Sequence, residues 1–159
     1  MDLVSWDNYP SYNTPWSFVA MTHDLMRGLK QAPFMLMEQT PSQQNWQPYN
    51  SLKKPGQMRA QSYQTIAHGA DTIQFFQLRR SIGACEKFHG AVIEHVGHED
   101  TRVFRETAAL GEELTRLSEV IGSENKAEVG VLFDWDNYWA LEYTSGPTVD
   151  LTYVQQIHQ

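Results

Sequence analysis

The chain of 159 residues contains one cysteine, Cys85, so an intrachain disulfide and a cysteine-based metal site are both excluded. A single thiol is typical of a reducing compartment, and we expect the protein to be cytoplasmic. No apolar run approaches the roughly 18 residues that a membrane span needs. The first residues are acidic and short of apolar length, which predicts that they are not a signal peptide.

Positive charge is also scarce. Twelve Lys and Arg stand against nineteen Asp and Glu, which gives a formal net charge of -7. Lys53-Lys54 and Arg79-Arg80 are the only adjacent basic pairs. Because nucleic-acid binding needs clustered cations, we expect no nucleic-acid partner. For the same reason we expect no attraction to an anionic membrane surface.

Apolar and aromatic residues are plentiful. Apolar residues make up 41% of the chain and five are tryptophan, as expected for a globular protein with a real core. Two aromatic stretches, Trp6-Asp7-Asn8-Tyr9 and Asn45-Trp46-Gln47, also carry polar side chains. Such mixtures suit sugar binding, although any one tryptophan can equally be a core residue.

Apolar runs and helical periods alternate along the chain. The predicted strands are Leu3–Trp6, Pro33–Met37, Thr72–Phe76 and Val129–Phe133. The predicted helices begin after the Thr14-Pro15 cap, at Gln57 and near Val103, and end near Leu29, His68 and Ile121. The second strand reads as one buried on both faces. This order predicts an α/β fold with a parallel sheet and right-handed crossovers.

The first three strands end in polar or aromatic residues, where parallel α/β folds carry their sites. Glu38 directly follows the apolar run of residues 34–37, so it is a candidate nucleophile or general acid, or a strand-end carboxylate facing solvent. A polar loop of residues 39–54 follows, and its length predicts a functional role.

Glu86 and His89 lie three residues apart and would share a face in a helical turn, as sugar ligands or as parts of an exposed loop. We expect Arg79-Arg80 to pair with site carboxylates such as Glu38 or Glu86. His95 and His98 lack the strong zinc spacings, so no metal and no cofactor are expected.

Several long strings resemble glycoside hydrolase family 42, the β-galactosidases. They are Ser5-Trp6-Asp7-Asn8-Tyr9-Pro10, residues 34–42, Asn45-Trp46-Gln47-Pro48-Tyr49-Asn50, His68-Gly69-Ala70-Asp71, residues 75–81 and 83–90, and the segments Phe133-Asp134-Trp135 and Ala140-Leu141-Glu142-Tyr143. The resemblance spans nearly the whole chain.

The resemblance implies a retaining exo-β-galactosidase with a (β/α)₈ barrel, followed by an α/β domain used in forming a homotrimer. Glu38 matches the nucleophile position, and Trp46 matches a tryptophan that lines the galactose site. Glu86 and His89 match the pair that holds galactose hydroxyls, and Trp6 and Tyr9 are expected to line the same pocket.

The chain lacks several features that the family pattern includes. A full barrel takes about 250 residues and eight strands. The family's acid/base glutamate follows an Asn, and no Asn-Glu dipeptide occurs here. The family's zinc-binding cysteine cluster is missing too. We therefore expect residues 1–124 to be the C-terminal part of a (β/α)₈ barrel of about three βα units. Residues 125–159 would begin the second α/β domain with a strand.

The chain alone would lack turnover, and an open sheet edge and uncovered core face would favour aggregation or partial order. A non-catalytic carbohydrate-binding module or a pseudoenzyme would use the same loops. A small flavodoxin-like domain is disfavoured because no Gly-rich loop follows a strand.

Overall fold

A computed structural model of the chain describes residues 2–124 and 126–159. By their internal contacts they separate into two compact units, Met1–Glu124 and Asn125–Gln159. The first unit holds the sheet and all of the predicted site residues.

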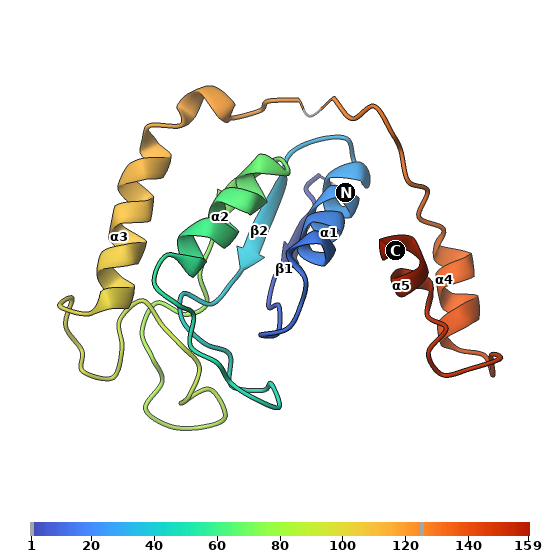
Figure 1. Cartoon of the computed structure of the whole chain (residues 1–159). Coiled ribbons are helices and arrows are strands. Elements are labelled where there is room, and N and C mark those ends of the chain that lie inside the picture. Colours follow the sequence, from blue (N-terminus) through green and yellow to red (C-terminus); the bar gives the residue numbers. More distant parts are fainter. Residues whose placement is uncertain (1, 125) are drawn as a thin grey trace. The chain divides into compact units, whose positions relative to one another are not determined.

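The first unit alternates strands and helices. Its elements are β1 (Ser5–Asp7), α1 (Trp16–Gly28), β2 (Phe34–Glu38), α2 (Gln57–Ala67), β3 (Ala70–Ile73), α3 (Arg102–Thr115) and a 3₁₀ turn, η1 (Ser118–Val120). The sheet order is β1-β2-β3, and both strand pairs are parallel (Figure 1). The predicted α/β class with a parallel sheet is therefore confirmed, with boundaries that differ by a few residues.

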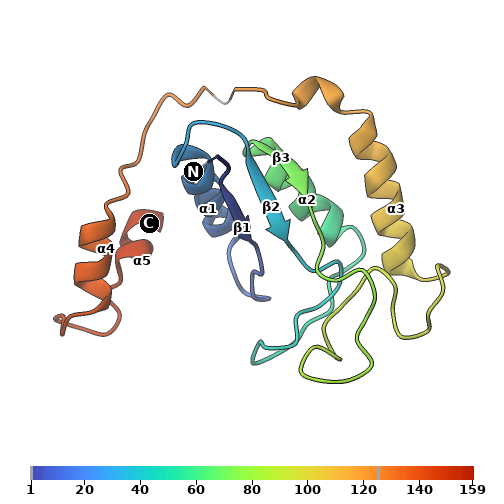
Figure 2. The ribbon, with the colours of Figure 1, turned by 180° about the vertical axis from the view of Figure 1, so that it is seen from behind.

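The core of this unit lies on one face of the sheet. Phe34 and Leu36 of β2 are fully buried, and Val4 and Ala70 join Phe34 in a cluster. Helices α1 and α2 cover this face, whereas the view from behind shows the other face of the sheet without a helix over it (Figure 2). The expectation that β2 is buried on both faces is wrong for the described residues, because Met37 on the opposite face remains 37% exposed.

The predicted strand at Val129–Phe133 is also wrong. These residues adopt no regular structure, and Val129, Val131 and Leu132 are largely exposed. A strand needs a neighbour to satisfy its backbone groups, and no described segment pairs with this one.

The second unit instead contains α4 (Trp135–Glu142) and α5 (Tyr153–His158). Asp134 caps α4 by accepting a hydrogen bond from the backbone N–H of Asn137 at 3.0 Å. The Phe133 ring packs edge-on against Trp135 and Tyr153, which joins the two helices.

None of the helices that the structure describes combines the length and the apolar character that crossing a bilayer would require.

Candidate active site

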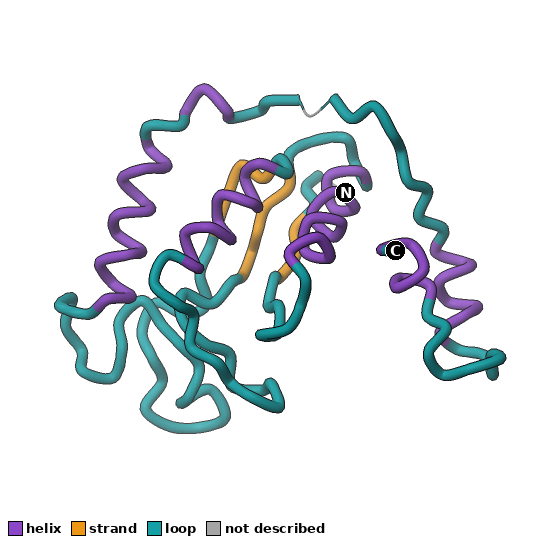
Figure 3. Tube along the Cα trace, viewed as in Figure 1, coloured by secondary structure: helices purple, strands orange, loops and turns teal. Residues whose placement is uncertain are grey.

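Long loops leave the carboxyl ends of the three strands and gather on one side of the first unit (Figure 3). Gln44 Nε2 donates to the carbonyl of Pro10 at 2.8 Å, which joins the loop after β2 to the loop after β1. This is the edge at which parallel α/β folds place their sites.

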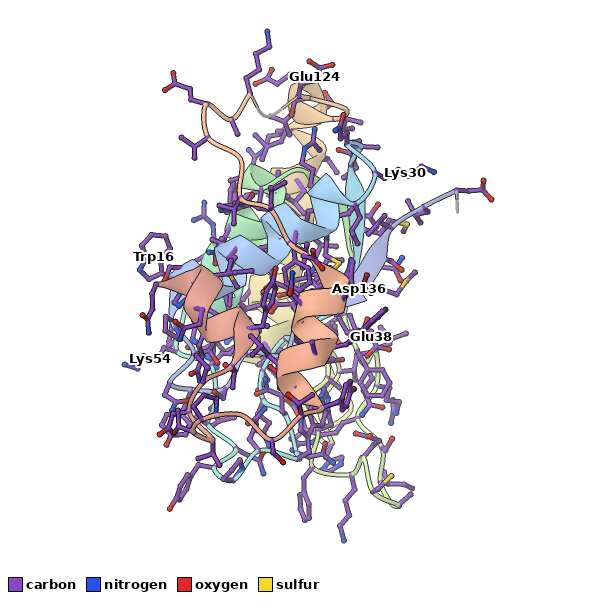
Figure 4. All side chains as sticks on the ribbon, turned by 90° about the vertical axis from the view of Figure 1, so that its right-hand side faces the viewer. Trp16, Lys30, Glu38, Lys54, Glu124 and Asp136 are labelled. Carbon is purple, nitrogen blue, oxygen red and sulfur yellow. The ribbon has the colours of Figure 1, made fainter. Side chains whose placement is uncertain are left out.

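Glu38 is the last residue of β2, one position further into the strand than its sequence pattern predicts. Its carbonyl accepts from Asn8 N at 2.9 Å, and the next residue, Gln39, donates its backbone N–H to Gln74 O at 3.1 Å. The Gln39 side chain donates to Ser62 Oγ of α2 at 2.8 Å. The backbone on which Glu38 stands is therefore held by both neighbouring strands and a helix, at the loop-bearing end of the sheet (Figure 4).

The Glu38 carboxylate is oriented by Tyr9. The Tyr9 hydroxyl donates to Glu38 Oε2 at 2.8 Å. Burial and this hydrogen bond hold the pKa of Tyr9 well above its usual value, so the phenol stays a proton donor. Asp7 lies beside Glu38 across β1 and β2, and burial followed by the Glu38 charge raises its pKa. A charge-assisted bond of this kind fixes one carboxylate oxygen and leaves the other for chemistry.

Aromatic rings from three loops pack together around Tyr9 and His89. The Tyr9 ring lies edge-on to Trp46, with centroids 4.9 Å apart, and edge-on to His89 at 5.8 Å. Trp46 stacks on His89 at 5.2 Å and stays half exposed. Phe76, in the loop after β3, contacts the His89 ring edge-on, with the ring centroids 5.1 Å apart. Residues from the loops after all three strands therefore meet at one place.

Two buried polar atoms in this group lack a hydrogen-bond partner among the described residues, namely Glu86 Oε2 and His89 Nε2. His89 is fully buried and its Nδ1 lies 2.9 Å from Gly90 O, which can only accept. Nδ1 therefore carries the proton, and in the neutral ring Nε2 is a bare acceptor. Unsatisfied buried polar atoms are uncommon in native proteins, and a bound ligand is one way in which they are satisfied.

Five of the six predicted site residues thus come together: Tyr9, Glu38, Trp46, Glu86 and His89, which we call the site cluster. The Glu86 carboxylate is near enough to Tyr9 to raise its pKa, and Glu86 O accepts from His89 N at 3.0 Å within one turn.

Trp6 is not brought to the site cluster. It lies opposite Leu36 in the register of β1 and β2, and its ring packs edge-on against His23 of α1 at 5.1 Å. Side chains two residues apart on a strand point to the same face of the sheet, so Trp6 lies on the face of Val4, which packs against the helices. Its role here is packing against the core.

The expected pairing of Arg79 and Arg80 with Glu38 or Glu86 is not found among the described residues. Arg79 is exposed, and Arg80 pairs with Glu94 at 2.6 Å. His95 Nε2 donates to Ser81 O at 2.7 Å, and within residues 2–124 and 126–159 no group of three His, Cys, Asp or Glu side chains could hold a metal ion.

The sequence pattern missed Phe76 and the cross-links between loops. Phe76 lies three residues after the end of β3, so the expectation that residues at strand ends carry the site could have included it. The cross-links depend on backbone positions inside irregular loops, for which no local pattern exists.

Comparison with known proteins places these features in a family. The family model described as β-galactosidase, glycoside hydrolase 42, matches residues 1–117. The chain is 68% identical over 161 residues to β-galactosidase BgaA of Planococcus sp. strain SOS Orange, and 54% identical over 157 residues to β-galactosidase LacZ of Lactobacillus acidophilus.

Solved structures of β-galactosidases also match the chain. The β-galactosidase of Bacillus circulans sp. alkalophilus matches 99% of the chain at 66% identity with a TM-score of 0.95. A catalytic mutant of Gan42B, a GH42 β-galactosidase from G. stearothermophilus, matches 99% at 43% identity with a TM-score of 0.93. The chain spans about a quarter of each of these relatives, 24% in every case.

Proposed function

Because the chain belongs to the glycoside hydrolase 42 family of β-galactosidases, we propose that it carries the nucleophile half of a retaining exo-β-galactosidase site. Glu38 is the nucleophile, and terminal non-reducing β-D-galactose is the substrate. The observation that carries this proposal is the hydrogen bond from Tyr9 to Glu38 Oε2, because the same Tyr9 ring packs against Trp46 and His89. A carboxylate that only faced solvent would have no such fixed partner.

In this mechanism Glu38 attacks the anomeric carbon while the bond to the leaving oxygen breaks. Tyr9 holds Oε2, so Oε1 is the oxygen that forms the bond to the sugar. A carboxylic acid about 5–5.5 Å away protonates the leaving oxygen and then takes a proton from water, which releases galactose with retained configuration. Tyr9 also donates to the carboxylate in the ground state, which keeps it aimed.

The sugar is held by the rest of the site cluster. The half-exposed ring of Trp46 offers a flat apolar face for the C–H side of a pyranose. Glu86 Oε2 and His89 Nε2 are buried acceptors that sugar hydroxyls would satisfy. Fixing the sugar over Glu38 in this way lowers the barrier by orientation.

The acid/base carboxylate lies outside these 159 residues in our proposal, because no Asn-Glu dipeptide occurs in them. Unit Met1–Glu124 is then the C-terminal part of a (β/α)₈ barrel, and Asn125–Gln159 belongs to the domain that follows it. We further propose that the parent protein is a cytoplasmic homotrimer.

A chimera tests the assignment of Glu38. These 159 residues replace the matching segment of BgaA from Planococcus, to which they are 68% identical. In this host chimera Glu38→Gln should lower turnover of nitrophenyl β-galactoside by roughly a thousandfold or more. Glu112→Gln, on the exposed surface of α3, is the matched control and should leave turnover unchanged.

Azide distinguishes a nucleophile from any other essential carboxylate. In Glu38→Ala, azide should occupy the space of the lost carboxylate, attack the anomeric carbon from that side and yield α-galactosyl azide. Full turnover by Glu38→Gln, or formation of the β-azide, would contradict the assignment. A chimera that binds galactose without any hydrolysis would instead favour the non-catalytic carbohydrate-binding module.

A further inference from the structure

Arg80 donates hydrogen bonds to the backbone of the turn that carries Glu86 and His89. Its Nη2 donates to Phe88 O at 2.8 Å and its Nε donates to Lys87 O at 3.3 Å. These two carbonyls belong to the residues between Glu86 and His89. The guanidinium thus binds the backbone of the turn and makes no hydrogen bond to the side chain of Glu86 or His89 among the described residues.

Glu94 holds the guanidinium in this position. Arg80 Nη1 donates to Glu94 Oε2 at 2.6 Å, and the two side chains are only 15% and 18% exposed. A pair this sheltered is screened less by water than a surface ion pair. The backbone near both residues is joined as well, since Arg80 N donates to Ile93 O at 2.9 Å.

The turn is also held from the side of the loop after β2. Gln43 Nε2 donates to Phe88 O at 2.8 Å, Gly90 N donates to Gln43 O at 2.8 Å, and Asn45 Nδ2 donates to Cys85 O. The turn itself lies between β3 and α3, outside any helix or strand. Its geometry therefore depends on contacts from the surrounding loops, among them those of Arg80.

We propose that Arg80, fixed by Glu94, is a positioning residue that presets the Glu86–His89 turn to receive the galactose hydroxyls. The inference rests on the proposed function of the site cluster. A guanidinium suits this task because its planar fork donates to several acceptors at once, whereas the single ammonium of a lysine is a point charge on a flexible stem. With the turn preset, sugar binding does not have to order it.

The effect should fall on sugar binding more than on bond cleavage, because Arg80 touches neither Glu38 nor Tyr9 by any described contact. In the host chimera Arg80→Ala should lower kcat/KM by roughly tenfold or more, mostly through a higher KM. Arg80→Lys should fall between wild type and alanine. Arg105→Ala removes the exposed pair with Asp100 and is the matched control, expected within about twofold of wild type.

Two further readouts distinguish positioning from general loosening. Added guanidinium ion should restore part of the kcat/KM of Arg80→Ala and none of that of Glu86→Gln. The double variant of Arg80→Ala with Glu86→Gln should lose little more than Glu86→Gln alone, because both act through one turn. Losses that multiply, or a KM for Arg80→Ala equal to that of the control, would overturn the proposal.

If Arg80→Ala does not fold, Glu94→Gln decides the matter. It keeps the shape of the side chain and removes the negative charge that holds the guanidinium, so a severalfold higher KM supports the inference and an unchanged KM overturns it. These outcomes are separate from a failure of the proposed function. The proposed function fails if Glu38→Gln retains turnover.

Discussion

Replacing Gly90 by alanine should push apart the two loops that build the site cluster. A Cβ at Gly90 would lie 2.7 Å from Gln43 N and 2.8 Å from Ser42 Cβ. The first of these atoms is backbone, so no flexible side chain can swing away. The backbone of Gly90 is not in the left-handed region, so the alanine is excluded by space alone and not by its own conformation.

The cost follows from these contacts. Overpacking against the backbone costs about 1–3 kcal/mol. The loops can separate only by stretching the 2.8 Å hydrogen bond from Gly90 N to Gln43 O, whose loss costs about 1 kcal/mol more. Gly90→Ala should therefore destabilise the chain by about 2–4 kcal/mol.

Urea unfolding of the host chimera measures the loss of stability, with Gly83→Ala in the same host as the matched control. A Cβ at Gly83 meets nothing within 4 Å, so this variant should stay within about 0.5 kcal/mol of wild type. In the host chimera, Gly90→Ala should also raise the KM for the galactoside, because His89 precedes the altered residue. Equal unfolding midpoints for the two alanine variants would refute the steric argument.

Three other outcomes are expected. Tyr9→Phe in the host chimera should lower kcat by roughly 10- to 100-fold, since it removes a hydrogen bond to a charged carboxylate; an unchanged kcat would contradict the role of Tyr9. Burial lowers the pKa of His23 from 6.5 to about 4, so its contribution to stability is complete above pH 6.5 and is lost as the pH falls toward 4. The loss should reach about 3 kcal/mol at most, and urea unfolding of His23→Gln should show a flatter pH dependence than wild type; parallel curves would rule this out. The 159-residue chain alone should not release nitrophenol from nitrophenyl β-galactoside, and measurable turnover that Glu38→Gln abolishes would show that the acid/base group lies within it.

Local sequence signals predicted the elements whose packing is determined by their own pattern. The continuous apolar run of residues 34–37 formed β2, and the Thr14-Pro15 signal placed the start of α1 within one residue. The apolar spacing of the third helix predicted an end near Ile121, which is too late, because α3 ends at Thr115 and the chain continues into η1. Boundaries are set by caps and neighbouring contacts as well as by periodicity.

The strand expected at Val129–Phe133 shows where the local signal is insufficient. An apolar run of five residues has the composition of a strand, yet pairing with another strand is a tertiary event. The same limit applies to Arg80, whose charge suggested a carboxylate partner but could not indicate Glu94 or the carbonyls of the turn.

Local patterns were enough to predict the alternation of strands and helices, the edge that carries the loops and the residue types that gather there, because periodicity and strand-end chemistry belong to single segments. The hydrogen bond from Tyr9 to Glu38, the stacking of His89 on Trp46 and the packing of Trp6 against α1 could be seen only once the chain was folded. These contacts join residues about 15 to 45 positions apart along the chain, and their geometry depends on strand register and loop cross-links that no single segment encodes.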